Sequence, residues 1–297
     1  MVFFARFQYF DHYSYLLYYE QLFDNNSFKD SLDESRFEPG FVFISHYISR
    51  FINTIELQFF IVASIVLIIK YSLFIRYLHS PYIAWLVYLI IFVPAFESNQ
   101  LRTAIISIFI LYALFNRERI KKFFLFPTFF GVLFHYGAAI ILFLNFERKL
   151  FIALLGSIFI IVLSFNMDAI LDFFDSDLIP LNQFITSSNN YQQANIFSSV
   201  HLVQFSIFLL GLMNWKNLSL NQRRGVIFLM IGSVVYISLS YNPSIAHRIR
   251  EISLLGILPL LFADKVVLTR SFIGIIFGVG YIASYSMYWH IMRLTIL

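Results

Sequence analysis

The sequence of 297 residues contains no cysteine and little charge, and both shortages limit what the protein can be. Without cysteine, disulfide bonds and thiol chemistry are excluded. Charged residues make up only 13% of the chain, whereas 59% of it is hydrophobic and the mean hydropathy is +0.75. A soluble domain of this length would need far more charge on its surface. The composition therefore predicts a multi-spanning membrane protein.

Several functional motifs are also missing. The sequence has no Walker-type phosphate loop, no His-Glu-x-x-His zinc spacing, no Gly-x-Ser-x-Gly elbow and no internal repeat of 20 to 50 residues. ATP-driven and metal-dependent chemistry are therefore disfavoured, and we expect no cofactor and no metal. The net charge of +4 comes without a basic patch carrying interleaved polar groups, so nucleic acid is not an expected partner.

The apolar runs predict an all-α integral membrane protein with about nine or ten transmembrane or re-entrant helices. About 20 residues are needed to cross the hydrocarbon at a rise of about 1.5 Å per residue, and several runs are shorter. The runs lie at 56–75, 81–96, 101–116, 121–134, 136–146, 150–166, 196–214, 225–241, 252–263 and 271–290.

Basic clusters predict which ends of these helices face the cytoplasm. They comprise Lys70 with Arg76, the run at 116–122, the run at 216–224, and Lys265 with Arg270. All four clusters lie on the cytoplasmic side only if residues 121–149 cross the membrane an even number of times. We therefore predict a helical hairpin or re-entrant pair that turns near His135, within the sequence FHYGA. The other polar clusters then lie on the outer side.

The predicted organisation has an extracytoplasmic N-terminal segment at 1–55 and a multi-span domain at 56–297 with an extracytoplasmic loop at 166–195. The stretch at 41–54 has apolar residues at helical spacing, which predicts an amphipathic helix on the outer surface. Residues 1–40 are too polar to span the membrane, and the first ten residues, MVFFARFQYF, are too short for a signal peptide with a cleavage site. We therefore expect a leading helix to have been lost from the sequence, although a short first helix docking sideways is an alternative.

The sequence FESNQLRTA at 96–104 places polar residues in an otherwise apolar region. Arg102 falls near the start of a predicted helix, where backbone amides and a guanidinium together suit an anion. Alternatively, Arg102 extends to lipid headgroups or pairs with Glu97. Glu97 is either a general base or simply the partner of Arg102. Asn99 and Gln100 add groups that suit sugar hydroxyls.

The sequence HRIRE at 247–251 forms a second polar cluster. On a helix, His247, Arg250 and Glu251 fall at positions i, i+3 and i+4 and share one face, while Arg248 is turned about 100° away. Arginines on the outer side oppose the usual distribution of basic residues, which favours a functional role. The alternative is an ordinary cytoplasmic basic loop.

Two further candidates carry weaker signals. His135 lies at the proposed hairpin turn, where an imidazole could bind phosphate or assist proton transfer, although a lone histidine in an apolar helix often only bonds the backbone. Tyr191 lies in the amide-rich stretch SSNNYQQAN at 187–195. That stretch is either a substrate-binding site or a merely flexible polar loop.

The order of several short motifs resembles a known family. These are Asp11 and Tyr15 in a D-x-x-x-Y pattern, EPGF at 38–41, LRTAIISIFIL, LFHYGAAI, and a late HRIRE followed by an apolar run with Pro259. Together, over about residues 11–260, they resemble the EpsG-like branch of the Wzy family of O-antigen and capsular polysaccharide polymerases.

The resemblance implies a metal-independent membrane glycosyltransferase. Such an enzyme transfers a growing glycan from undecaprenyl pyrophosphate to a single lipid-linked repeat unit. It would lie in the bacterial inner membrane as a multi-pass protein, with its active site on the periplasmic or extracellular side. The implied architecture is similar to the GT-C glycosyltransferases, whose helices surround an outward-facing cavity. The implied partners are undecaprenyl-pyrophosphate-linked oligosaccharides, the bilayer and a chain-length regulator protein.

This reaction requires fixed cations where pyrophosphate charge develops, and a carboxylate or imidazole near the acceptor hydroxyl. We accordingly expect catalytic roles for Glu97, His135, His247 and Glu251, and pyrophosphate binding by Arg102, Arg248 and Arg250. Substrate binding is expected of Asp11, Tyr15, Glu38, Asn99, Gln100 and Tyr191; for Asp11, Tyr15 and Glu38, only the resemblance suggests a role.

Other functions fit the same composition. A flippase for lipid-linked oligosaccharides, or another transporter, would usually show internal repeats and ionisable residues near the middle of the membrane. An O-antigen ligase would use the same donor and similar arginines with a different acceptor. A noncatalytic assembly subunit is the third alternative.

Overall fold

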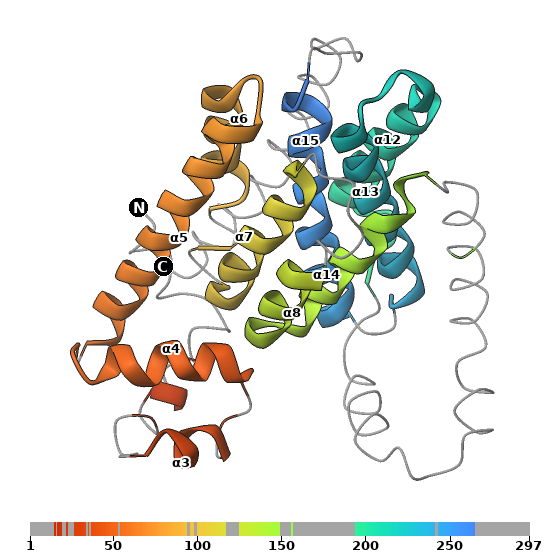
Figure 1. The fold of residues 1–297 in the computed structure, drawn as a ribbon. Coiled ribbons are helices and arrows are strands. Elements are labelled where there is room, and N and C mark those ends of the chain that lie inside the picture. Colours follow the sequence, from red (N-terminus) through yellow and green to blue (C-terminus); the bar gives the residue numbers. More distant parts are fainter. Residues whose placement is uncertain are drawn as a thin grey trace, which may run out of the picture. The chain divides into compact units, whose positions relative to one another are not determined.

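A computed structural model gives the structure of the protein (Figure 1). It describes Tyr15, 17–19, Leu22, 27–33, Ser35, 37–52, 54–93, 96–97, 100–116, 125–148, Gly156, 194–240 and 243–264. Every regular element within these ranges is a helix and none is a strand, which confirms the predicted all-α class. The predicted helices at 150–166 and 271–290 and the loop at 166–195 fall almost wholly outside the described residues.

The chain divides into two compact units, which are described separately. Unit 1 comprises Met1–Leu142, Phe262–Lys265 and Ser286–Leu297, and unit 2 comprises Phe143–Leu261 and Val266–Tyr285. The boundary predicted at residue 55 remains a prediction.

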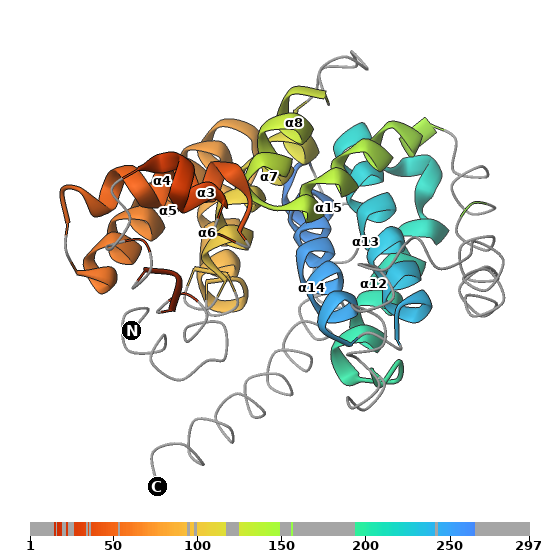
Figure 2. The ribbon, with the colours of Figure 1, turned by 90° about the horizontal axis from the view of Figure 1, so that it is seen from below.

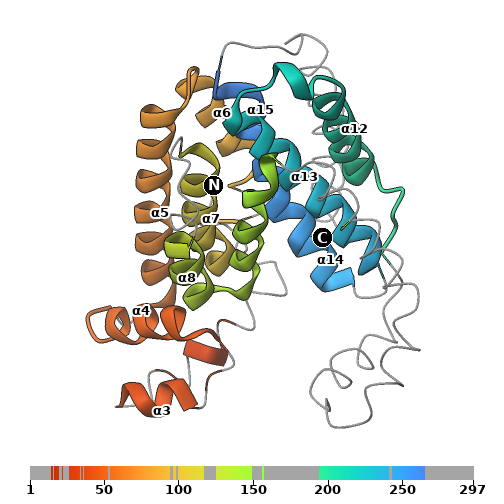
Figure 3. The same cartoon turned by 45° about the vertical axis from the view of Figure 1, so that its right-hand side comes forward.

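Unit 1 is built from helices whose bounds lie close to the predicted apolar runs. They are α3 (Phe28–Asp33), α4 (Pro39–Ser49), α5 (Ile55–Tyr77), α6 (Pro81–Ile91), α7 (Leu101–Phe115) and α8 (Leu125–Phe134). Proline at the first position starts α4 and α6, where its missing N–H costs nothing. Of the described helices, α5 alone has the length and composition to cross a membrane, and α6, α7, α8 and α12 are shorter apolar helices. In Figures 1 and 3, α3 and α4 lie across one end of α5.

The helix predicted at 41–54 is α4. One face buries Phe41, Val42 and His46, and the other exposes Phe43 and Tyr47, so the helix has the two distinct faces that its pattern indicated. Its location on an outer membrane surface remains a prediction.

The chain breaks at His135, as predicted. Helix α8 ends at Phe134, and a 3-10 helix, η3 (Tyr136–Arg148), follows. A Cβ added to Gly131 would lie 2.6 Å from the Cβ of Ala138. In a continuous helix, two residues seven positions apart would be separated by about 10 Å along the axis. The chain therefore folds back on itself here, and Gly131 leaves room for that contact.

A directed set of hydrogen bonds joins α3 to α4. Arg50 Nη2 lies 3.1 Å from His46 Nε2, and because arginine only donates, this nitrogen is the acceptor. His46 Nδ1 therefore carries the proton, and it donates to Ser31 Oγ at 3.1 Å. Ser31 Oγ in turn donates to the Ser27 carbonyl at 3.1 Å. The arrangement requires a neutral imidazole.

Acidification should weaken this part of unit 1. Burial, and then the positive charge of Arg50, lower the pKa of His46. The unfolded chain therefore binds a proton first, so the stabilisation is complete above the usual pKa of about 6.5 and is lost as the pH falls below it. We expect the thermal unfolding midpoint of the purified protein to decrease from about pH 7.5 to about pH 5.5, and to decrease less in His46→Gln. Equal pH dependence in both proteins would contradict this assignment.

Unit 2 contains α12 (Ser199–Met213), η5 (Trp215–Asn217), α13 (Leu220–Ser238), α14 (Pro243–Ser253), η6 (Leu254–Gly256) and most of α15 (Ile257–Phe262). Figure 2 shows α13 close to both α12 and α14. A capping box between Ser219 and Gln222 starts α13. Gly225 and Gly256 bring the backbones of α13 and η6 together, because a Cβ on Gly256 would lie 2.6 Å from the Gly225 carbonyl oxygen. This contact holds α13 against η6, which directly follows α14.

Candidate functional site

The first polar centre in unit 1 is an ion pair between α7 and the start of α4. Arg102 is the second residue of α7, and Glu38 immediately precedes α4 as its N-cap residue. Arg102 Nη1 lies 2.6 Å from Glu38 Oε2. Glu38 is buried, whereas 17% of the Arg102 side chain remains exposed. The pair is therefore partly screened from water, and its short distance is typical of a charge-assisted hydrogen bond.

Aromatic rings surround this ion pair. The Arg102 guanidinium carbon lies 4.4 Å from the centroid of the Phe37 ring, which is a cation–π distance. Tyr15 is a hydrogen-bonding neighbour of Arg102, and its ring stacks on Phe37 at 5.5 Å. Tyr15, Phe37, Glu38 and Arg102 are called the Arg102 cluster below. It unites three predicted site residues that are far apart in the sequence.

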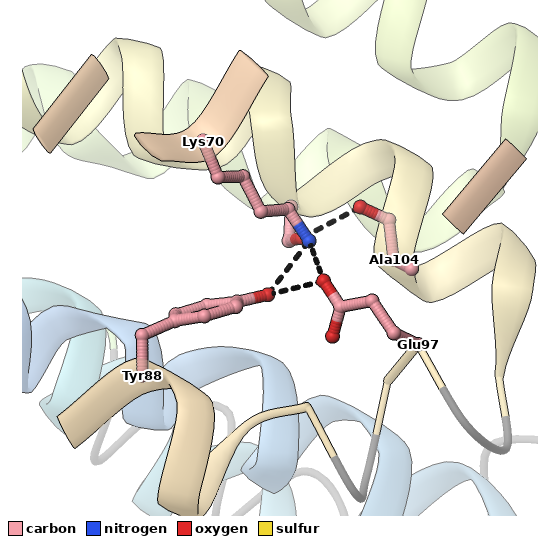
Figure 4. Close-up of polar contacts among 5 residues, drawn as sticks. Lys70, Tyr88, Glu97 and Ala104 are labelled. Atoms are coloured by element: carbon pink, nitrogen blue, oxygen red, sulfur yellow. Dashed lines mark hydrogen bonds and ion pairs between the residues drawn. The ribbon is translucent and has the colours of Figure 1, made fainter. Parts of the chain in front are cut away.

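A second polar centre in unit 1 is completely buried. Lys70 of α5, Tyr88 of α6 and Glu97 of the turn before α7 form the buried triad, and all three side chains have 0% exposure. Lys70 Nζ lies 2.5 Å from Glu97 Oε1 and donates to the Tyr88 hydroxyl at 2.6 Å. The Tyr88 hydroxyl donates to the same Glu97 oxygen at 2.8 Å. Figure 4 shows the three polar ends converging beside Ala104 of α7.

Unit 2 contains a centre around the ring of Tyr236 on α13. The Arg250 guanidinium carbon lies 4.9 Å from the centroid of that ring. The His201 ring stacks on it at 4.6 Å, and the His247 ring meets it edge-on at 5.4 Å. His201, Tyr236, His247 and Arg250 are called the Arg250 cluster below. Within the described part of the chain, Arg250 Nε and His201 Nδ1 are buried without a hydrogen-bond partner.

The Arg250 cluster is electrostatically positive. Arg250 Nη1 donates to Ser198 Oγ at 3.4 Å, and its Nη2 lies 4.0 Å from Glu251 Oε1. Burial, and then the charge of Arg250, lower the pKa of His247. His247 is therefore neutral near pH 7 and able to accept a proton.

Comparison with known protein families decides the affiliation of the chain. Residues 1–295 match the EpsG family. The chain belongs to the EpsG family. This family is linked to exopolysaccharide biosynthesis. No curated protein and no solved structure matches the chain.

Two predictions about charges in this EpsG family member are wrong. Glu97 was a possible partner of Arg102, but it bonds Lys70 and Tyr88, and Arg102 pairs with Glu38. Lys70 was taken as a marker of the cytoplasmic side, but it lies in the interior of α5 and is fully buried. In the turn before α7, Phe96 and Glu97 are both fully buried.

The remaining predicted site residues of the EpsG family member lie in different environments or outside the described residues. His135 Nδ1 accepts a hydrogen bond from the Gly137 amide at 2.9 Å, so this imidazole supports the backbone turn. Gln100 Oε1 accepts from the Thr103 hydroxyl at 2.9 Å within the first turn of α7. Arg248 is half-buried on α14. Asp11, Asn99 and Tyr191 lie outside the described residues.

The structure confirms that His247 and Arg250 share one face of α14. The residues that this face contacts were not predicted. His247 and Arg250 both contact Tyr236, as their spacing required. The sequence did not identify His201, Tyr236, Lys70 or Tyr88 as candidate site residues. One signal was present for His201: Ser198, His201 and Gln204 recur every three residues at the start of an apolar helix, which marks a polar stripe on one face.

Proposed function

We propose that this EpsG family member is a polysaccharide polymerase of the bacterial cytoplasmic membrane. It transfers a glycan from undecaprenyl pyrophosphate to a lipid-linked repeat unit on the outer face of the membrane. Family membership supports a role in exopolysaccharide synthesis, and α5 with the shorter apolar helices supports a membrane location. The observation that carries the proposal is the convergence of Tyr15, Glu38 and Arg102, from three separate motifs, on one charged and aromatic centre.

The transfer breaks the bond between the anomeric carbon and a pyrophosphate oxygen, and forms a bond from that carbon to an acceptor hydroxyl oxygen. Negative charge grows on the leaving pyrophosphate, and a guanidinium with its planar set of donors stabilises such charge well. Arg102 in unit 1 and Arg250 in unit 2 are each suited to bind the pyrophosphate of a lipid-linked substrate. The GT-C-like architecture belongs to the same proposal.

The proton of the acceptor hydroxyl needs a base. Neutral His247 is suited to this step, because its lowered pKa leaves the ring able to accept a proton at neutral pH. Glu251 is half-exposed, and its carboxylate lies 4.0 Å from Arg250, which fits a supporting role in the same cluster. In unit 1, Glu38 orients Arg102.

A transporter is the second candidate, and one observation favours it. Lys70, in the interior of a long apolar helix, forms a buried ion pair with Glu97, and ionisable residues at such positions are a feature of proteins that move ions or charged substrates across membranes. A flippase for the same lipid-linked oligosaccharides would therefore also fit. An O-antigen ligase remains an alternative because it uses the same donor.

Deletion of the gene separates these functions. If the protein is the polymerase, export and capping continue without it, so the surface lipid should carry at most one repeat unit. Gel electrophoresis of the surface polysaccharide, with visualisation of individual chain lengths, gives the readout. Loss of every repeat unit would instead indicate a flippase or a ligase, and an unchanged ladder would refute both proposals.

A further inference from the structure

We propose that Lys70, Tyr88 and Glu97 are positioning residues, which hold the turn before α7 and thereby set the place of Arg102. The functional part of this inference rests on the proposed polymerase. The structural part, that the buried triad fixes the first turn of α7, does not depend on it.

The geometry of the buried triad is suited to holding one segment in place. Three elements contribute one side chain each: α5 gives Lys70, α6 gives Tyr88 and the turn gives Glu97. The three contacts among them measure 2.5, 2.6 and 2.8 Å, so they form a closed triangle of polar atoms. A buried carboxylate that meets both a lysine and a tyrosine has little freedom to move.

Three backbone hydrogen bonds connect the turn that contains Glu97 to α6 and α7. The Phe96 amide bonds the Phe92 carbonyl at 2.8 Å, the Gln100 amide bonds the Phe96 carbonyl at 2.8 Å, and the Ala104 amide bonds the Gln100 carbonyl at 2.9 Å. The turn is therefore hydrogen-bonded to Gln100, the residue that precedes α7, and through Gln100 to the first turn of that helix. Any displacement of Glu97 is transmitted to the first turn of that helix, where Arg102 lies.

Arg102 is thus held from two directions. Its side chain is fixed by Glu38 at 2.6 Å and by the Phe37 ring at 4.4 Å, and its backbone is fixed through Glu97. A guanidinium that stabilises charge only in the transition state must be accurately placed. A misplacement of about 1 Å costs roughly 100-fold in rate.

Stability alone does not account for an ionic triad here. Lys70 is the single charged residue in the interior of α5, between Glu56 and Arg76. Replacing a buried ion pair by apolar side chains of similar size is often neutral or stabilising, so the pair is better explained by the alignment that it specifies. Lys70 can meet Glu97 in only one register of the turn, and that register determines which residue begins α7.

The decisive variant is Lys70→Met with Glu97→Met, which removes both charges and keeps the volume. We expect the purified full-length protein to retain a thermal midpoint close to wild type. Hydrogen exchange in peptides covering 96–104 should become roughly tenfold faster, and kcat should fall about 10-fold to 100-fold with KM for the lipid substrate nearly unchanged. Gln58→Met is the matched control, because Gln58 is another buried polar residue of α5 and bonds the Ile52 carbonyl. It should leave exchange at 96–104 and kcat unchanged.

Wild-type exchange at 96–104 together with wild-type kcat in the double variant would overturn the inference. If the double variant does not fold, Tyr88→Phe decides, since it removes one hydroxyl and leaves the ion pair. Faster exchange at 96–104 with a lower kcat in Tyr88→Phe would support the inference, and no change in either would overturn it. If wild-type protein makes no polysaccharide, the proposed function fails, and the exchange measurement alone still decides whether the triad fixes the turn.

Discussion

Replacing Arg102 with lysine should slow glycan transfer almost as much as replacing it with alanine, by about 30-fold to 1000-fold. The guanidinium of Arg102 donates to Glu38 and lies over Phe37, and 17% of the whole side chain stays exposed, so a ligand can reach Arg102 while these contacts support it. An ammonium is a point charge and cannot reproduce this planar, forked contact. Losing one such contact to developing charge costs about 2 to 4 kcal/mol of transition-state stabilisation.

The measurement is the single-turnover rate of purified protein in liposomes that contain lipid-linked repeat units, together with chain length in the complemented deletion strain. Arg76→Lys is the control. Arg76 is an exposed residue at the end of α5 that contacts Tyr77, and lysine should replace it with full activity. Full-length polysaccharide from the Arg102→Lys variant would mean that Arg102 serves only to anchor the protein in the bilayer.

Helix positions could be predicted from the sequence because they depend on local properties. The helical spacing of apolar residues at 41–54 and the apolar runs at 56–75 and 81–96 were enough to find α4, α5 and α6, with starts within two residues and ends within five. The break at His135 was predicted because all the basic clusters had to lie on the cytoplasmic side of the membrane. These signals act within one segment, so tertiary packing changes them little.

Partners of charged residues could not be predicted, because they depend on packing between segments. Glu97 and Arg102 are five residues apart, but Glu97 lies in the turn before α7 and Arg102 in the first turn of that helix. They therefore face different neighbours. Arg102 meets Glu38, 64 residues earlier, and Glu97 meets Lys70, 27 residues earlier.

Lys70 shows the limit of the positive-inside rule. The rule treats each lysine as a surface residue, but a lysine in an apolar helix can be buried when a carboxylate and a hydroxyl satisfy it. Nothing local to α5 indicates that Glu97 and Tyr88 will supply these groups. The motif order did identify Tyr15, Glu38 and Arg102 as candidates, although only the structure shows that they meet.

Arg250→Lys should likewise reduce glycan transfer by about 30-fold to 1000-fold, whereas Arg248→Lys should change it by no more than about threefold. The two arginines were equivalent candidates in the sequence, and the structure separates them. Arg250 is 7% exposed and lies over the Tyr236 ring, which two histidines also contact, whereas Arg248 is half-buried on the same helix. A planar guanidinium can stack on the ring and still present its edge, which an ammonium cannot do.

Loss of folding must be distinguished from loss of chemistry, since Arg250 also supports the packing of unit 2. Gly232→Ala is a suitable control: its new Cβ would clash with Ser253 Oγ, which donates to the Arg250 carbonyl, and so would disturb the packing of α13 on α14 while Arg250 keeps its guanidinium. Thermal midpoints and single-turnover rates of Gly232→Ala, Arg248→Lys and Arg250→Lys are compared. At a matched loss of thermal stability, Arg250→Lys should be far slower than Gly232→Ala. If the two lose activity in proportion to stability, Arg250 holds α14 in place and contributes no charge stabilisation to the reaction.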